Sequence, residues 1–200
     1  MKIRTLDQLH EAIDAEMAWR KRELTAIKAN VFKSRSFAQE TALRSGIALL
    51  YAHWEGSVKN IATFYLQYVS NLSLPYCKLK LNFLAISVKS EIDKFRSTNK
   101  ASLQTDIVSL VHTRQNEKSR IPQSNIIRAN SNLNSTTFSE IMASIGLCCS
   151  FYEPSYTLID DVLLNMRNKI AHGGKLDYLS LDEERYNEIH EKIFIIIRGC

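Results

Sequence analysis

Cysteine, glycine and long apolar runs are all scarce in this sequence. Its 200 residues include 4 Cys and 6 Gly. The cysteines form no CxxC pair and no His lies near them at zinc-ligand spacing, which excludes a zinc finger and a disulfide framework. We expect reduced, mostly packed thiols. No stretch approaches the roughly 20 apolar residues that span a bilayer, and the first residues lack an apolar signal region. These absences predict a cytoplasmic protein without a membrane partner.

Signatures of cofactor and nucleophile chemistry are also missing. The sequence has no Gly-rich phosphate loop and no Ser nucleophile elbow. His10, His112 and His190 have no Cys or carboxylate partners at metal-ligand intervals. The sequence therefore predicts neither a cofactor nor a metal site.

The overall composition is ordinary, with a modest basic excess. Hydrophobic residues make up 45% of the chain, the formal net charge is +5 and the sequence pI is about 9.0. A chain of this size and apolar content can bury one core, so we expect a single domain over residues 1–200. The charge is compatible with a polyanionic partner such as RNA, but it is equally ordinary in a helical bundle.

Apolar residues recur every three or four positions along most of the chain, which predicts an all-α bundle. Thr5-x-x-Gln8 resembles a capping box that opens a helix to about residue 30. A second helix, which we expect to be central, runs from about Ser36 towards Pro75.

The second half of the chain shows shorter elements. Residues 76–82 alternate between polar and apolar side chains, which predicts a short extended segment. Further helices are predicted at 83–95, 101–113, 137–146 and 158–172, and from 180 towards the C-terminus. The expected N-caps of the last three are Thr137, Thr157 and Ser180, and glycines at 146 and 173–174 close the first two of these. Residues 115–135 form a long polar loop, and such loops are usually functional or disordered.

One stretch combines a fixed cation with a titratable ring, namely Arg167-Asn168-Lys169-Ile170-Ala171-His172-Gly173-Gly174. Arginine fits a phosphate bidentately, and a neutral imidazole can take up and return a proton near neutral pH. At about 100° per residue, Arg167 and His172 point about 140° apart on a straight helix. Fraying at the glycine stop would let His172 turn towards the arginine, and Asn168, one turn before His172, could hold its ring. This pattern is typical of phosphate chemistry.

A purely structural interpretation of the same residues stays open. Arg167 would then pair with Asp160, Asp161 or Glu153. His172 would simply occupy a helix C-terminus, where the helix dipole favours a cation.

A second constellation lies on the predicted central helix. Arg44, Tyr51 and Glu55 follow helical spacing and form a polar row beside an apolar stripe. We expect Glu55 to orient Arg167. The alternative is a surface ion pair between Arg44 and Glu55, worth under about 1 kcal/mol.

Other polar and aromatic residues are assigned structural roles. We expect Trp54 to lie in the core and His53 to be a bonded helix residue rather than a catalyst. Arg20, Lys21 and Arg22 form a basic cluster, which we interpret as solvated helix surface rather than a phosphate contact.

Together the two constellations resemble the HEPN superfamily. Arg-Asn-x-Ile-Ala-His-Gly near the end of an all-helical chain is similar to the R-x4-6-H signature of that superfamily. The phrase Leu-Tyr-Ala-His-Trp-Glu-Gly at residues 50–56, with Arg44 upstream, is similar to the stand-alone MAE-like branch found in bacterial toxin–antitoxin and defence loci. The resemblance covers nearly the whole chain. It implies a HEPN-like helical bundle with a long C-terminal helix.

The resemblance also implies an activity. It predicts a metal-independent endoribonuclease, usually a homodimer in which both motifs face one cleft. Arg167 would stabilise charge on the scissile phosphate, His172 would act as general base or acid, and Asn168 would bind phosphate or fix the imidazole. The polar row of the central helix would support them. The products would be a 2′,3′-cyclic phosphate and a 5′-hydroxyl, and the implied partners are RNA, a second copy of the chain and, in a toxin, a neutralising antitoxin protein.

Two other functions remain open from the sequence. One is a non-catalytic HEPN-like bundle that binds a nucleotide or a partner protein and merely retains the motif. The other is a structural or immunity-type helical protein with no nucleic-acid partner. RNA cleavage that depends on His172, and RNA binding whose affinity falls with salt, would distinguish the nuclease from both.

Overall fold

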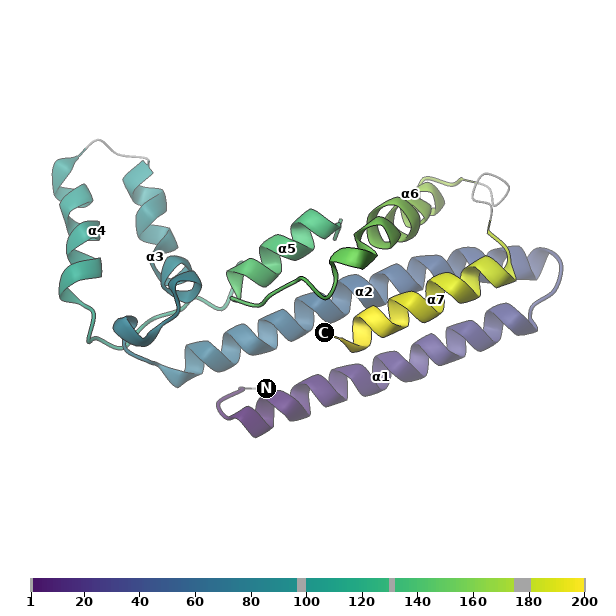
Figure 1. Ribbon diagram of the computed structural model, residues 1–200, viewed down its shortest axis with the longest axis horizontal. Helices are drawn as coiled ribbons and strands as arrows, with labels where there is room; N and C mark the ends of the chain where they lie inside the picture. The colour runs from purple at the N-terminus through teal and green to yellow at the C-terminus, as the bar shows by residue number, and fades with distance from the viewer. Residues whose placement is uncertain (1, 97–99, 130–131, 175–180, 200) are drawn as a thin grey trace.

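The protein is an all-α fold, as the sequence predicts. The computed structural model describes residues 2–96, 100–129, 132–174 and 181–199 (Figure 1). Two long helices, α1 (Leu6–Lys33) and α2 (Phe37–Leu72), run antiparallel, and α7 (Glu183–Arg198) packs against both. Within the described ranges there is no β-strand.

The remaining elements lie across α2 from α1 or beyond the end of α2 (Figure 1). They are α3 (Leu81–Arg96), α4 (Ala101–Thr113), α5 (Ser135–Ser144), a π-helix (Leu158–Leu164), α6 (Asn165–Ala171) and 3-10 turns at Tyr76–Lys78 and Glu153–Ser155. Helix α2 packs against α1, α5, the π-helix, α6 and α7. It is therefore the central helix, as predicted.

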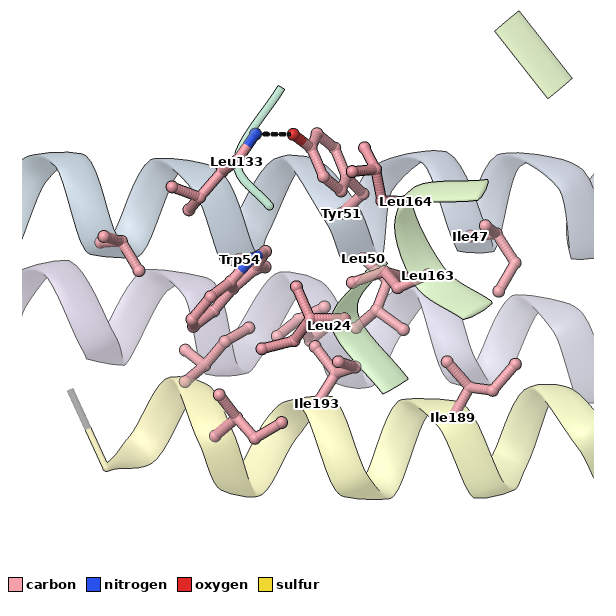
Figure 2. Packing of buried hydrophobic residues seen from close by; sticks show 14 of the residues in the cluster. Leu24, Ile47, Leu50, Tyr51, Trp54, Leu133, Leu163, Leu164, Ile189 and Ile193 are labelled. Atoms are coloured by element: carbon pink, nitrogen blue, oxygen red, sulfur yellow. Dashed lines mark hydrogen bonds between the residues drawn. The ribbon is translucent and has the colours of Figure 1, made fainter. Parts of the chain in front are cut away.

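The core fills the space between α2 and the helices around it. Leu24 of α1, Trp54 of α2 and Ile193 of α7 have none of their surface exposed, and they lie together in Figure 2. The Trp54 ring also packs against Phe138 of α5, with ring centroids 5.2 Å apart. Burying each such side chain stabilises the fold by about 1.5–3 kcal/mol. Trp54 is a core residue, as predicted.

Two of the predicted helix ends are confirmed. The Thr5 hydroxyl accepts a hydrogen bond from the Gln8 amide at 3.2 Å, and the Gln8 side chain in turn accepts from the Arg4 amide at 2.8 Å. At the C-terminal end of α5, Gly146 follows the C-cap residue Ile145 and adopts a φ of 70°. Glycine adopts this left-handed conformation without steric cost.

Three predicted N-caps are not the ones the structure uses. The Asn134 side chain accepts from the Thr137 amide, so α5 begins two residues before the predicted cap. Thr157 already has helical dihedral angles and makes no capping bond. Ser180 lies outside the described residues, and Asp182 caps α7 by accepting from the Arg185 amide. Asn and Asp cap helices as well as Ser and Thr do, and the caps of α5 and α7 are the nearby Asn134 and Asp182.

The extended segment predicted at residues 76–82 is wrong. Residues 76–78 form one 3-10 turn, α3 begins at Leu81, and the nearest β pairing is an isolated bridge between Pro75 and Lys118. A short alternation of polar and apolar residues also fits a turn that exposes its side chains. Cys77 in this turn and Cys148 are exposed, so the prediction of mostly packed thiols is wrong for both.

The connection between α4 and α5 is less polar than its composition indicates. Its described residues, 114–129 and 132–134, include the buried side chains of Ile121, Ala129 and Leu133. The Leu133 amide donates to the Tyr51 hydroxyl at 2.6 Å, which Figure 2 shows. This connection is therefore anchored to the central helix.

Candidate functional site

Arg167 and His172 lie on a helix that consists of the π-helix (Leu158–Leu164) followed by α6, and that we call the motif helix. It runs antiparallel to α2 (Figure 1). π-Helical segments are rare in proteins, and those that occur often lie at functional sites. Within this π-helix, Asp160 accepts from the Ser135 amide at 2.7 Å and from the Ser135 hydroxyl at 2.5 Å. Asp160 therefore holds the start of α5. The alternative in which Asp160 pairs with Arg167 is wrong.

Arg167 is half-buried and is fixed without a carboxylate. Its guanidinium carbon lies 4.8 Å from the centroid of the Tyr51 ring. Its Nη1 donates to Oδ1 of Asn168 at 2.8 Å. No described Asp or Glu forms an ion pair with it, which also removes Asp161 and Glu153 as partners. A cation held by a ring and an amide keeps its charge available for an anionic ligand.

His172 is exposed at the C-terminal end of α6. Its amide still donates to the Asn168 carbonyl at 3.0 Å, so the helix does not fray before His172, contrary to the sequence-based expectation. At about 100° per residue, the Cβ atoms of Arg167 and His172 therefore point about 140° apart.

The Arg167 side chain contacts Asn168, which shares a helix face with His172. Asn168 lies one turn before His172 on the same face of the helix, where Cβ atoms are about 5–6 Å apart. Because the guanidinium of Arg167 reaches the Asn168 amide, it comes to that same face. Asn168 thus links the cation to the edge of α6 that carries the imidazole, and its amide N–H groups remain available as donors.

The two glycines end α6, as the sequence predicts, and the hydrogen bonds there form a Schellman motif. Gly173 has a φ of 80°, and its amide donates to the Ile170 carbonyl at 3.1 Å. The Gly174 amide donates to the Lys169 carbonyl at 2.8 Å, and a Cβ at Gly174 would lie 2.8 Å from that oxygen. One glycine supplies the left-handed conformation and the other the close approach.

Replacing Gly173 with alanine is expected to lower the free energy of unfolding by about 1–2 kcal/mol, the cost of a left-handed non-glycine residue. Urea denaturation of the two proteins measures this. Lys169→Ala is the matched control in the same helix, because this exposed change is expected to stay within about 0.5 kcal/mol. Equal midpoints for Gly173→Ala and wild type would contradict the role given to this glycine.

The polar row of α2 lies beside this site but does not pair as predicted. Glu55 forms its ion pair with Lys59 at 3.6 Å and not with Arg167. Burial, together with the Glu55 carboxylate, raises the pKa of Tyr51, whereas Arg167 acts in the opposite direction. The Tyr51 hydroxyl therefore stays protonated and accepts from the Leu133 amide, and the Tyr51 ring lies beneath the guanidinium.

Arg44 lies two turns before Tyr51 on the same face of α2 and is half-buried. It forms no ion pair with a described residue, so the alternative Arg44–Glu55 pair is not formed. Helices α6 and α2 run antiparallel (Figure 1). Because Arg167 lies over Tyr51, a residue that precedes Tyr51 on α2, such as Arg44, lies towards the His172 end of α6. Arg44 is thus a further cation near this site that has no ion-pair partner among the described residues.

Sequence reasoning missed a buried polar network between α1 and α2. Arg20 is 4% exposed, so its assignment to solvated surface is wrong. Its Nε donates to Glu16 at 2.9 Å, and its Nη1 lies 3.2 Å from both Nδ1 and the carbonyl oxygen of His53. Glu16 also accepts from Trp19 at 2.9 Å and from Asn60 at 2.6 Å.

The network explains two residues of the 50–56 phrase. Arginine has only donors, so Nδ1 of His53 accepts, and Nε2 donates to Glu23 at 3.1 Å. A Cβ at Gly56 would lie 2.7 Å from Nη2 of Arg20, so glycine makes room for the guanidinium. His53 is thus a bonded helix residue, as predicted. Its partner Arg20 lies 33 residues away in the sequence, so the spacing of residues within the 50–56 phrase does not reveal this contact.

Acidification is expected to destabilise the fold. Burial lowers the pKa of His53 and of His190, and the charge of Arg20 lowers that of His53 further. The unfolded chain therefore binds more protons than the folded chain as the pH falls below about 6.5, which favours unfolding. Urea midpoints at about pH 7.5 and about pH 5.5 measure this, with the lower midpoint expected at the lower pH. An equal or higher midpoint at the lower pH would contradict it.

Other kinds of site lie outside the motif residues or are absent from the described part of the chain. Among the described residues, no group of three or more His, Cys, Asp or Glu side chains lies together as metal ligands would. No described helix combines the length and apolar character needed to cross a membrane. A cavity of about 410 Å³ between α1 and α2 is lined by Glu11, Glu16, Trp19 and neighbouring apolar residues, and by none of the motif residues.

Comparison with known proteins gives one family. The family model described as RiboL-PSP-HEPN matches residues 15–199. Neither the curated proteins nor the solved structures contain a match.

Proposed function

Because the matched region covers most of the chain, the protein belongs to the RiboL-PSP-HEPN family, and we propose that it is a metal-independent endoribonuclease. The observation that carries the proposal is the guanidinium of Arg167, which is held by Tyr51 and Asn168 and forms no ion pair with a carboxylate of the described residues. An exposed imidazole, His172, lies one turn beyond that amide. A cation, a neutral donor and a proton-transfer group at one edge are what phosphodiester cleavage requires.

In the proposed reaction the ribose 2′-oxygen attacks the adjacent phosphorus. His172 takes the 2′-hydroxyl proton as the 2′-oxygen–phosphorus bond forms. The bond from phosphorus to the 5′-oxygen breaks, and that oxygen takes up a proton from a second imidazole. Arg167 and the Asn168 amide bind the non-bridging oxygens, where negative charge grows. The products are a 2′,3′-cyclic phosphate and a 5′-hydroxyl, and DNA is not a substrate because it lacks the 2′-hydroxyl.

We further propose that the active unit is a homodimer. The Cβ atoms of Arg167 and His172 point about 140° apart on α6, so one chain presents its imidazole at the outer edge of the site. A second copy facing this edge would bring a second His172 to the same phosphate. It would supply the proton that the leaving oxygen requires.

RNA cleavage activity per chain is therefore expected to rise with protein concentration and to level off once nearly all chains are in dimers. Cleavage rates over a dilution series, compared with sedimentation velocity at the same concentrations, measure this. The two curves should coincide. Constant activity per chain across the monomer–dimer transition would reject the shared site while leaving the nuclease proposal standing.

The proposal is tested by incubating the purified protein with RNA in EDTA. We expect cleavage, with cyclic phosphate ends on the products, because no step uses a metal ion. Absence of cleavage across a range of RNA substrates, or cleavage that EDTA abolishes, would contradict it.

A second candidate is a non-catalytic bundle that binds a nucleotide or partner protein. The wide angle between Arg167 and His172 on one helix favours it. It predicts RNA or nucleotide binding without cleavage, unchanged by His172→Ala. Membership of the MAE-like branch and a role as a toxin or defence effector are also parts of the first proposal, and growth arrest on expression that depends on His172 would support that role.

A further inference from the structure

The positive charge of the chain is concentrated in one segment. Residues 76–128 hold ten Lys and Arg and four Asp and Glu side chains, a net charge of +6. The whole chain holds 26 Lys and Arg and 21 Asp and Glu, a net charge of +5, so everything outside this segment carries a net charge of −1. The segment comprises the turn after α2, the projecting α3–α4 hairpin and the connection that follows (Figure 1).

The start of this segment meets residues 114–120 at the C-terminal end of α2. Pro75 and Lys118 form an antiparallel bridge, and the Ser119 amide donates to the Leu74 carbonyl at 2.9 Å. A small apolar cluster lies beneath them, made of Leu66, Val69, Phe83, Ile86 and Ile121. This contact between residues 74–80 and 114–120, which we call the junction, is therefore a fixed part of the fold.

Three cations at the junction are exposed and lack acidic partners among the described residues, whereas another, Arg114, pairs with Glu117 at 2.8 Å. Lys78, Lys118 and Arg120 are all exposed, and none forms an ion pair with a described residue. The Arg120 amide donates to the Tyr76 hydroxyl at 3.3 Å, which fixes its backbone. In the bundle, by contrast, several cations are paired with carboxylates, namely Arg20 with Glu16, Lys28 with Glu191, Lys59 with Glu55 and Arg185 with Glu188.

We propose that the junction is a second RNA-binding surface, which holds the phosphate backbone of the substrate away from the site of cleavage. The inference rests on the endoribonuclease function proposed above. Unpaired Lys and Arg side chains on a fixed surface are the groups that bind phosphates irrespective of base sequence. An acidic protein partner would use the same charges, but the proposed reaction already supplies a polyanion to this molecule.

Distance along α2 sets the length of RNA that can use both surfaces. Tyr51, beside Arg167, and Leu72, two residues before the junction, are 21 residues apart on one helix, which is about 30 Å at 1.5 Å per residue. That span corresponds to about nine nucleotides of helical strand at 3.4 Å each. A substrate of four nucleotides therefore cannot reach the junction, whereas one of about 24 nucleotides can.

The test reverses three charges at the junction and three on the bundle. The junction variant is Lys78→Glu, Lys118→Glu and Arg120→Glu. The control is Lys21→Glu, Arg22→Glu and Lys192→Glu, which are exposed on α1 and α7 and give the same final net charge. Binding of the long RNA is measured by filter binding at several salt concentrations, with His172→Ala added to each protein to prevent cleavage. Cleavage of the short and long RNAs is measured with His172 intact.

The junction variant is expected to bind the long RNA about tenfold or more weakly, with a salt slope smaller by about 2, because each phosphate contact contributes about 0.7 to the slope. The control is expected to lose less than about threefold. Both variants should cleave the short RNA at the wild-type rate.

Equal losses in the two variants, or no loss in the junction variant, would overturn the proposal while wild-type cleavage still supported the nuclease. If the wild-type protein cleaves neither RNA, the endoribonuclease function on which this inference rests is contradicted instead.

Discussion

Replacing His172 with alanine is expected to reduce RNA cleavage by about 10²–10⁴-fold, the usual contribution of a general acid or base. The imidazole is exposed at the edge of α6, next to the amide that holds the Arg167 guanidinium. Histidine is the side chain that most often transfers a proton in such reactions. Single-turnover cleavage in EDTA measures the loss, because product release does not then mask the chemical step.

The loss must come from chemistry and not from unfolding. The side chain of His172 makes no hydrogen bond with a described residue, so the free energy of unfolding is expected to change by less than about 0.5 kcal/mol. His10→Ala is the matched control, since His10 is an exposed histidine on α1. Full activity in His10→Ala alongside the loss in His172→Ala would assign the effect to position 172. Undiminished cleavage in His172→Ala would remove the proposed base.

Replacing Arg20 with methionine is expected to lower the free energy of unfolding by about 3–5 kcal/mol, which is typical when one partner of a buried ion pair is removed. The change keeps most of the side-chain volume but leaves Glu16, whose side chain is 10% exposed, without its cation. It also removes the donor to His53 Nδ1. Urea denaturation at constant pH measures the loss.

Two variants separate the network from other effects of the substitution. Arg22→Met on the exposed side of α1 is expected to stay within about 0.5 kcal/mol. Combining Arg20→Met with Glu16→Leu is expected to recover part of the loss, because the unpaired carboxylate is removed as well. A loss below about 1 kcal/mol for Arg20→Met would contradict the importance given to this network.

Local signals were sufficient for most helices and for the end of the motif helix. The helix predicted at 101–113 is observed as Ala101–Thr113, because its apolar spacing is regular and its ends are polar. The stop at Gly173 and Gly174 was predictable because few other residues adopt the left-handed conformation. In each case the deciding information lies within a few residues of the chain.

Features set by packing between distant segments were not predictable. The burial of Arg20 depends on His53 and on the missing side chain at Gly56, more than 30 residues further along. The apolar residues between Leu158 and Leu164 follow the three- and four-residue spacing of an α-helix, so periodicity does not reveal the π-helical register. The pairing of Arg167 with Tyr51 and Asn168 likewise follows from how α6 docks on α2.

The most direct measurement compares two RNA oligonucleotides in EDTA, one fully ribose and one with a single 2′-deoxynucleotide immediately before the scissile phosphate. If Arg167, Asn168 and His172 promote attack by the 2′-oxygen, wild-type protein will cut the first and leave a cyclic phosphate end. The second will remain intact at the substituted position, and His172→Ala will cut neither at an appreciable rate. Equal cleavage of the two oligonucleotides at that position would contradict the proposed chemistry.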